Sequence, residues 1–304
     1  MVTTNLRGKT GEGGFYRPLL MLSFKLDHLL SGGSAAWQHV HNVLLHACAA
    51  ALVFNVAGKM FRPRLPWAAA VAGWMFLVLP VHTDSVFWIS GRSDTLCAVF
   101  YLLALGFFLD IIRGARAGRG LLALLCCFGA FLVKEMAFSL PLILLCVALA
   151  HWRLRQRRVW LLTAGVFACA GLYLVLRWLV LGALFDSAPN TNLSLERVLG
   201  SLRLATSHLL LSDLPFVPHG LMAAAVIAVT RGLLRRTLSP LMVSLVLCLF
   251  LVSLGPVMGL IMPWYLYIPS AFACLLVVPL FSHPWPARTI RPGRGPRRET
   301  PRAR

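Results

Sequence analysis

The chain has 304 residues, of which 59% are hydrophobic and 13% are charged, and its formal net charge at pH 7 is +19. Soluble domains contain about 45–50% apolar and about 25% charged residues. This composition, with a mean hydropathy of +0.77, therefore excludes a soluble globular domain and a disordered chain. The apolar residues form long blocks near the length of about 20 residues that a membrane-spanning helix needs. The composition predicts an all-α, polytopic transmembrane helix bundle.

The first 36 residues precede the first apolar block of spanning length, and they include an amphipathic segment, residues 17–30. Its leucines lie partly on one face of a helix, whereas Lys25, Asp27 and His28 lie off that face. Such a pattern favours a helix that lies along the outer membrane interface. Residues 195–211 have a similar pattern and predict a second interfacial helix on the outer side.

Nine apolar blocks follow, and each is interpreted as a span. They cover residues 37–56, 65–81, 96–112, 120–133, 137–152, 160–183, 220–234, 241–257 and 265–281. All eight cysteines lie inside these blocks. Buried cysteines behave as small hydrophobic residues, so neither a disulfide framework nor a metal cluster is expected.

Residues 120–152 would be about 50 Å long as one helix, too long for a hydrocarbon core of about 30 Å. Arginines flank both ends, so the chain enters and leaves on the same side. The segment therefore predicts a hairpin of two short spans with Lys134 and Glu135 at its outer tip. These two residues either form an ion pair that caps the spans or present a lysine, held by the glutamate, to a phosphate.

The breaks between the blocks alternate in charge. Most of the 29 basic residues fall in one set of breaks and in the C-terminal tail, and the positive-inside rule places these in the cytoplasm. Eight of the ten acidic residues fall on the opposite, outer side. Residues 282–304 predict a disordered basic tail that contacts anionic lipid headgroups. The tail has no interleaved aromatic residues for base stacking, so nucleic acid is not an expected partner.

The outer break at residues 80–94 concentrates polar and charged side chains. Asp84 and Asp94 are candidates for a general base or a metal ligand, and Arg92 is a candidate phosphate ligand because guanidinium groups bind phosphate through paired hydrogen bonds. An alternative interpretation stays open. In it, Arg92 and Asp94 pair with each other at a helix N-terminus that Ser93 or Asp94 caps.

Two further groups allow two interpretations each. His39, Asn42 and His46 share one face of the first span and could be ligands, but hydrogen bonds to neighbouring helices are the favoured interpretation. Tyr265 and Tyr267 open the last span, either as part of an interfacial aromatic belt or as part of a pocket.

Five segments together resemble one family in their order and spacing, the polytopic C-type glycosyltransferases (GT-C). The segments are FYRPLLMLSFKLDHLL, HVHNVLLH, PVHTDSVFWISGRSD, VKEMAFSLPLILL and YLYIPS. The similar branch is that of the O-mannosyltransferases with tetratricopeptide repeats and their bacterial relatives. The resemblance implies a GT-C-like transmembrane domain in residues 37–281. Residues 1–36 would then be the remnant of a first outer loop with its juxtamembrane helix.

The resemblance implies transfer of a sugar, with mannose as the candidate, from a polyprenyl-phosphate-linked donor to a protein or glycan acceptor. Transfer would take place at the periplasmic or endoplasmic reticulum lumenal face of an integral, multi-pass membrane protein. Inverting transfer needs a carboxylate for the acceptor's proton and cations for the departing phosphate. The acids Asp84 and Asp94 would be catalytic and support a metal ion or the acceptor. Arg17, Arg92 and Lys134 would bind the donor phosphate.

The same motifs carry over the pocket residues Tyr16, His82, Glu135, Tyr265 and Tyr267. The metal is not assigned, and a divalent cation is left open as a cofactor.

The sequence departs from the family pattern at several places. The helix that precedes this start in the family is missing, together with the acidic loop residue taken as the base, and the repeats are missing too. Pro263 and Trp264 stand where the family usually has Glu-Arg. We therefore expect an N-terminally truncated enzyme. The alternative is a non-catalytic lipid-binding or scaffold protein of the same fold. A transporter is disfavoured because the sequence has no inverted repeat.

Overall fold

The computed structural model describes residues 15–61, 67–151, 156–182, 199–200, 203–204, 207, 240–257, 262–276 and 278. All regular secondary structure in these residues is helical, which confirms the predicted all-α class. The α-helices are α1 (Pro18–Ser31), α2 (Ala35–Phe61), α3 (Trp67–Val78), α4 (Thr83–Phe87), α5 (Arg92–Ile112), α6 (Gly118–Phe131), α7 (Leu140–Ala150), α8 (Arg157–Leu181), α11 (Pro240–Leu254) and α12 (Tyr267–Leu275). Short 3-10 helices are η1 (Pro80–His82), η2 (Ile89–Gly91), η3 (Glu135–Ser139), η5 (Gly255–Val257) and η6 (Pro263–Leu266).

Three described helical stretches are long and apolar enough to cross a membrane, namely α2, Ile89–Ile112 and α8. A fourth results if α3 and Pro80–Phe87, which are bent by 49°, count as one span. Shorter apolar helices occupy Gly118–Phe131, Glu135–Ala150 and Val243–Leu254. The chain is thus an all-α membrane protein. The number of nine spans stays a prediction, and the predicted span 220–234 lies outside the described residues.

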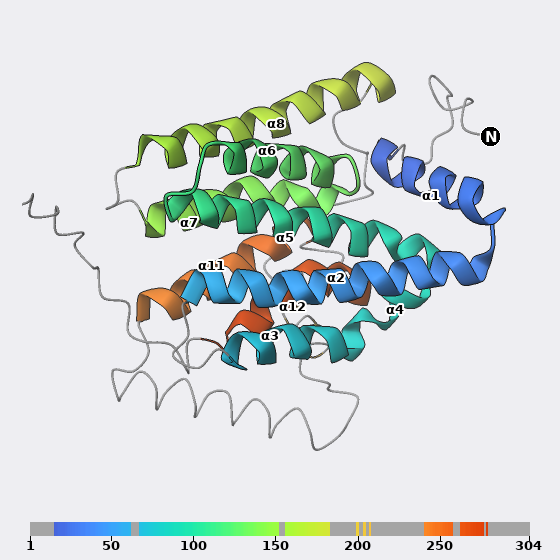
Figure 1. The fold of residues 1–304 in the computed structure, drawn as a ribbon, viewed down its shortest axis with the longest axis horizontal. Helices are drawn as coiled ribbons and strands as arrows, with labels where there is room; N and C mark the ends of the chain where they lie inside the picture. Colours follow the sequence, from blue (N-terminus) through green and yellow to red (C-terminus); the bar gives the residue numbers. More distant parts are fainter. Residues whose placement is uncertain are drawn as a thin grey trace, which may run out of the picture.

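The helices run roughly side by side, and α5 lies in the middle of the bundle between α2 and α6 (Figure 1). The most apolar 18-residue window of α5 is 72% buried, against 39% in α2 and 28% in α8. Tyr101 and Phe108 of α5 are fully buried, whereas Trp178 and Leu179 of α8 are more than half exposed. An outward apolar surface of this kind is typical of helices that face lipid.

The hairpin predicted for residues 120–152 is confirmed as two antiparallel helices, α6 and α7 (Figure 1). The helical turn of α6 ends because Lys134 adopts an extended backbone conformation, with φ −157° and ψ 145°. One 3-10 helix, η3, then leads into α7, whose first turn contains Pro141. Lys134 and Glu135 therefore stand at the tip of the hairpin, as expected.

The amphipathic segment 17–30 forms α1, as predicted, at the end of the bundle where α2 and α5 begin (Figure 1). Four of its leucines, Leu22, Leu26, Leu29 and Leu30, are between 51% and 71% exposed, whereas Leu20 is 7% exposed and belongs to the apolar core. Asp27 also faces the bundle and is 1% exposed. The face of the helix that meets the bundle thus combines the apolar residues Leu20 and Phe24 with the buried Asp27, and Lys25 and His28 are exposed.

All eight cysteines have free thiols, and the sulfur atoms of Cys146 and Cys248 lie 3.8 Å apart between α7 and α11. The other predictions about chain organisation fall largely on residues that the structure leaves undescribed. These are residues 1–14, most of the second amphipathic segment 195–211, and the tail 282–304.

Candidate active site

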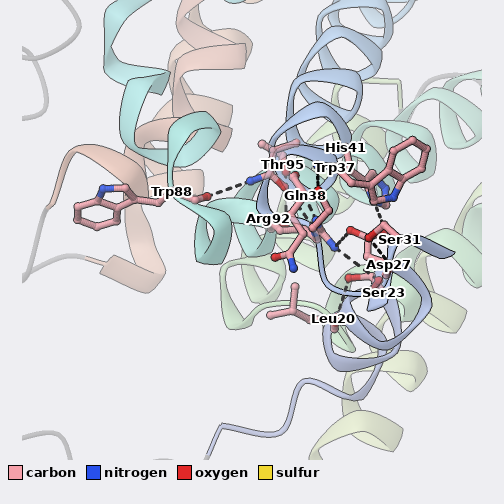
Figure 2. Close-up of polar contacts among 12 residues, drawn as sticks. Leu20, Ser23, Asp27, Ser31, Trp37, Gln38, His41, Trp88, Arg92 and Thr95 are labelled. Atoms are coloured by element: carbon pink, nitrogen blue, oxygen red, sulfur yellow. Dashed lines mark hydrogen bonds and ion pairs between the residues drawn. The ribbon is translucent and has the colours of Figure 1, made fainter. Parts of the chain in front are cut away.

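Arg92, the first residue of α5, lies at the end of the bundle where α1 is attached (Figure 1). Its side chain is fully buried and points toward α1, where Nη1 lies 2.5 Å from Asp27 Oδ2 (Figure 2). Nε donates to Asn42 Oδ1 at 3.1 Å, Nη2 to the Gln38 carbonyl at 3.2 Å and Nη1 to the Ser23 carbonyl at 3.5 Å. All three guanidinium nitrogens are therefore engaged by the protein itself.

Asp27 connects three helices. Its Oδ1 accepts a hydrogen bond from His41 Nδ1 of α2 at 2.9 Å, while its Oδ2 pairs with Arg92 of α5. Burial alone would raise the pKa of the Asp27 carboxyl, but the hydrogen bond with His41 and the charge of Arg92 outweigh it, so the pKa lies below the ordinary value of 3.8. The carboxylate is therefore ionised at neutral pH.

The interpretation in which Arg92 pairs with Asp94 is wrong. Asp94, two residues after Arg92 in α5, faces Lys134 at the hairpin tip instead. Lys134 Nζ lies 2.6 Å from Asp94 Oδ1, and each of the two side chains is 6% exposed. Arg92 and Asp94 thus pair with residues from two different helix ends and hold both against α5.

The proposed cap at the start of α5 is also wrong, because the Ser93 hydroxyl donates to Asp94 and the Asp94 oxygens contact Ser93 and Lys134 instead of backbone N–H groups. The 3-10 helix η2 runs directly into α5, and the Arg92 backbone N–H bonds to carbonyls of η2. Gly91 fits this tight junction since a Cβ at that position would overlap the backbone of Ser85.

Lys134 and Glu135 do not pair with each other, so the interpretation as an ion pair that caps the two spans is wrong. Lys134 Nζ lies 5.2 Å from the centre of the Tyr265 ring, over its face, in addition to its contact with Asp94. Ser93 Oγ donates to the other Asp94 oxygen at 3.5 Å.

The carboxylate of Glu135 forms ion pairs with two arginines. Arg17, just before α1, approaches it with Nη2 at 2.5 Å from Oε2 and Nε at 3.0 Å from the same oxygen. Arg177 of α8 approaches Oε1 with Nη1 at 3.4 Å. Arg17 and Glu135 are 20% and 28% exposed, while Arg177 is only 4% exposed. This group is therefore open to a ligand on the Arg17 side.

Tyr16 is held beside Arg17 by α8. The Tyr173 hydroxyl donates to the Tyr16 carbonyl at 2.9 Å, and the two rings are 5.9 Å apart. The Leu19 N–H donates to the Leu132 carbonyl of the hairpin at 3.2 Å. The predicted residues Tyr16, Arg17, Lys134, Glu135 and Asp94 are therefore brought together at one end of the bundle.

The predicted pocket residues His82 and Tyr267 lie in a buried polar cluster, and Tyr267 is close enough to Asp94 for the charge of that carboxylate to act on it. Tyr267 hydroxyl and His46 Nδ1 are 2.6 Å apart, and His46 Nε2 lies 3.0 Å from the Leu77 carbonyl. His82 Nε2 lies 2.7 Å from Ser270 Oγ. Tyr267 is 1% exposed, so the aromatic-belt interpretation is wrong for this residue.

The favoured interpretation of the first span is confirmed for two of its three polar residues. His46 makes the contacts just described, and Asn42 donates to the Trp88 carbonyl at 2.9 Å. His39 is half-buried, and within the described part of the chain it has no hydrogen bond.

Asp84 stands apart from the other predicted acid. It is half-exposed in the first turn of α4, and among the described residues no hydrogen bond or ion pair involves its side chain. No group of three or more His, Cys, Asp or Glu side chains is placed to hold a metal ion within those residues. Asp84 and Asp94 are thus not joined into a metal site here.

Sequence reasoning missed two residues of the site. Arg177 interrupts an apolar block, which is costly in a membrane and by itself indicates a function or a buried partner. Asp27 was assigned to the polar face of α1, but no local pattern indicates that this face turns toward Arg92, 65 residues away in the sequence.

The arrangement of Arg17, Lys134 and Arg177 around Glu135 and Asp94 can bind an anion. Three cationic side chains face two carboxylates, which leaves one positive charge in excess. Arg17 is close enough for its charge to act on Asp94 as well as on Glu135. We refer to these five residues as the cationic cluster.

No protein-family model and no solved structure matches the chain. Curated relatives do match. Protein O-mannosyl-transferase Tmtc2 of Drosophila melanogaster is 40% identical over 110 residues, which are 36% of this chain and 12% of the relative. Tmtc1 of the same organism is 36% identical over 130 residues, 43% of this chain and 15% of the relative. TMTC4 of Mus musculus is 41% identical over 101 residues, 29% of this chain and 14% of the relative.

The chain therefore spans only a small part of the length of the curated relatives that it matches. Within that part, the resemblance to O-mannosyltransferases inferred from the five sequence segments is confirmed.

Proposed function

We propose that this chain is a membrane mannosyltransferase of the GT-C type, which transfers mannose from a polyprenyl-phosphate donor to a hydroxyl group of a protein. The names of the relatives, protein O-mannosyl-transferases, support the sugar and the protein acceptor. The observation that carries the proposal is the cationic cluster, in which Arg17, Lys134 and Arg177 converge on two carboxylates.

The cationic cluster fits the phosphate of such a donor. Glu135 lies between Arg17 and Arg177 as an anion with two arginine partners, and a phosphate oxygen has the same preference for guanidinium donors. Arg17 is the most accessible of the three cations, so we assign it the first contact with the phosphate. All three guanidinium nitrogens of Arg92 already have partners in the protein, so we do not assign Arg92 to the phosphate site.

The chemistry that the cationic cluster can supply is stabilisation of negative charge. The acceptor oxygen would bond to C1 of mannose as the bond from C1 to the phosphate oxygen breaks, and the phosphate would keep the bonding electron pair. Arg17 and Lys134 would stabilise the negative charge that develops on that phosphate. A carboxylate would act as the base that takes the proton of the acceptor hydroxyl. Of the two proposed catalytic residues, Asp94 is paired with Lys134, whereas Asp84 has no ion pair among the described residues, so we assign this role to Asp84.

The donor places the reaction at the membrane surface. Its polyprenyl chain would lie against lipid-facing helices with the phosphate at the headgroup level. By the charge distribution of the sequence, this surface is the periplasmic or endoplasmic reticulum lumenal one, and the basic tail is cytoplasmic and contacts anionic headgroups.

The test uses the full chain in liposomes with radiolabelled mannosyl-phosphoryl-polyprenol and a Ser/Thr-containing peptide. We expect transfer by the wild-type chain and a loss of about tenfold or more in kcat/KM for Arg17→Gln, equivalent to at least about 1.4 kcal/mol of transition-state stabilisation. Lys25→Gln is the matched control, because Lys25 is an exposed cation on the adjacent helix α1. Equal transfer by Arg17→Gln and Lys25→Gln would contradict the assignment of the phosphate site.

The closed ion pairs favour one alternative, a non-catalytic protein that binds lipid phosphate. Lys134 and Asp94 neutralise each other in the interior, and neither needs a ligand. This alternative predicts that the wild-type chain binds the mannosyl-phosphoryl-polyprenol but does not transfer its sugar. Absence of both binding and transfer would contradict both functions.

A further inference from the structure

The helix α1 contacts the bundle through apolar and polar groups. Leu20 and Phe24 pack against the apolar core, and the residue that α1 buries most deeply is Asp27. Lipid is as apolar as leucine, so an apolar face gives a helix in a membrane no driving force to leave lipid for protein. Packing and polar contacts then decide where such a helix lies. The contacts of Asp27 with His41 and Arg92 therefore add to this packing and fix the C-terminal half of α1.

The partner of Asp27 is arranged for this purpose. Arg92 is fully buried, lies at the fixed start of α5, and is oriented by Asn42 and Gln38 from α2 (Figure 2). Its guanidinium also lies 4.5 Å from the centre of the Phe24 ring, so it touches α1 at a second residue. A buried pair with this many fixed partners specifies one position of α1 relative to α5.

The other end of α1 reaches the cationic cluster. Arg17 directly precedes the helix and contacts Glu135, and the first-turn residue Leu19 bonds to the Leu132 carbonyl. Arg17 and Asp27 are ten residues apart, which corresponds to about 15 Å along an α-helix. Because a helix of this length is stiff, a movement of α1 at Asp27 also moves Arg17.

We infer that Asp27 and Arg92 are positioning residues, which clamp α1 to α5 and thereby hold Arg17 against Glu135. Arg92 acts on the site through α1 and does not contact the phosphate. The kinetic consequence rests on the proposed mannosyltransferase function, whereas the structural consequence does not.

The structural test is hydrogen exchange of the full chain in nanodiscs, with the variants Asp27→Asn and Arg92→Gln. We expect the α1 amides to exchange about tenfold or more faster in each variant, with α3, α6 and α7 unchanged, because α1 opens locally. Lys25→Gln, on the exposed face of α1, should leave exchange unchanged. Unchanged α1 exchange in both variants, or an equal increase throughout the bundle, would overturn the proposal.

The double variant Asp27→Asn/Arg92→Gln removes both charges together. We expect it to exchange more slowly than Arg92→Gln alone, because that single change leaves the Asp27 carboxylate buried beside a neutral group. Additive effects of the two changes would overturn the direct pairing that the clamp requires.

The kinetic test separates positioning from phosphate contact. With mannosyl-phosphoryl-polyprenol as substrate, we expect Asp27→Asn to lower kcat/KM about tenfold, as Arg17→Gln does, and to cause little further loss when it is combined with Arg17→Gln. Losses of kcat/KM that multiply in the double variant Asp27→Asn/Arg17→Gln would contradict action through Arg17. If the wild-type chain shows no transfer, the proposed function fails, and the exchange experiment still decides whether the clamp exists.

Discussion

Both ends of α5 carry ion pairs, and the two sets differ in burial. At the end where α5 begins, Arg92 is 0% and its partner Asp27 2% exposed. At the other end, Lys59 lies 2.9 Å from Asp110, and these two side chains are 19% and 18% exposed. Arg119 joins Asp110 at 3.5 Å and is 51% exposed. The ion pair at the N-terminal end of α5 is therefore buried, whereas the ion pairs at its C-terminal end are partly exposed to solvent.

This difference in burial indicates which ion pairs the fold depends on. Removing one partner of a buried pair leaves a charge that water cannot reach, which costs several kcal/mol. Removing one partner of an exposed pair exchanges an ion contact for water and costs little. We therefore expect the Arg92 end to be sensitive to single neutral substitutions and the Asp110 end to tolerate them.

The largest effect is expected for Lys134→Gln, which leaves the Asp94 carboxylate buried without its cation. We expect a loss of about 3–5 kcal/mol in the free energy of unfolding, measured by denaturant titration of the purified protein in detergent. Lys134→Gln/Asp94→Asn, which removes both charges, should recover most of that loss. A double variant no more stable than the single one would show that the contact contributes through packing and not through charge.

A smaller effect on stability is expected when the pH is lowered until Asp27 is protonated. Its pKa in the folded protein is lowered, because the contacts with His41 and Arg92 outweigh burial, so the clamp contributes fully above the ordinary value of 3.8 and loses its contribution as pH falls below that value. The difference in melting temperature between wild type and Asp27→Asn should be constant from neutral pH to about pH 5 and should narrow only at lower pH. A difference that already disappears near pH 6 would mean that burial dominates the pKa.

The smallest effect is expected for Lys59→Gln at the Asp110 end. The pair is partly exposed and Arg119 remains as a second cation for Asp110, so we expect a loss of about 0–1 kcal/mol. The same denaturant titration measures it beside Lys134→Gln. A loss as large as that of Lys134→Gln would remove the contrast between the two ends.

The fold was predictable in its class and in many of its elements. Apolar blocks of spanning length predicted α2, α5 and α8, and the arginines that flank residues 120–152 predicted the hairpin of α6 and α7. These features are local, because the length of an apolar run and the charge beside it are fixed by consecutive residues.

The sequence predicted which residues belong to the candidate site, but it did not predict which of them form ion pairs with each other. Arg17, Asp94, Lys134 and Glu135 were predicted as site residues, and the structure brings them together. The sequence suggested Arg92 with Asp94 and Lys134 with Glu135, since neighbours in the chain are the simplest partners. The structure instead pairs residues across helices, because consecutive positions at a helix end or turn point in different directions.

By itself, the sequence determined that this is an all-α membrane protein with polar residues gathered at particular breaks between apolar helices, and it determined the resemblance to O-mannosyltransferases. Only the tertiary structure decided that Asp27 faces inward to Arg92 and that Arg177 joins Arg17 at Glu135. The physical reason is that a buried charge requires a partner of opposite sign, but the identity of that partner depends on which helix ends the packing brings within about 3 Å.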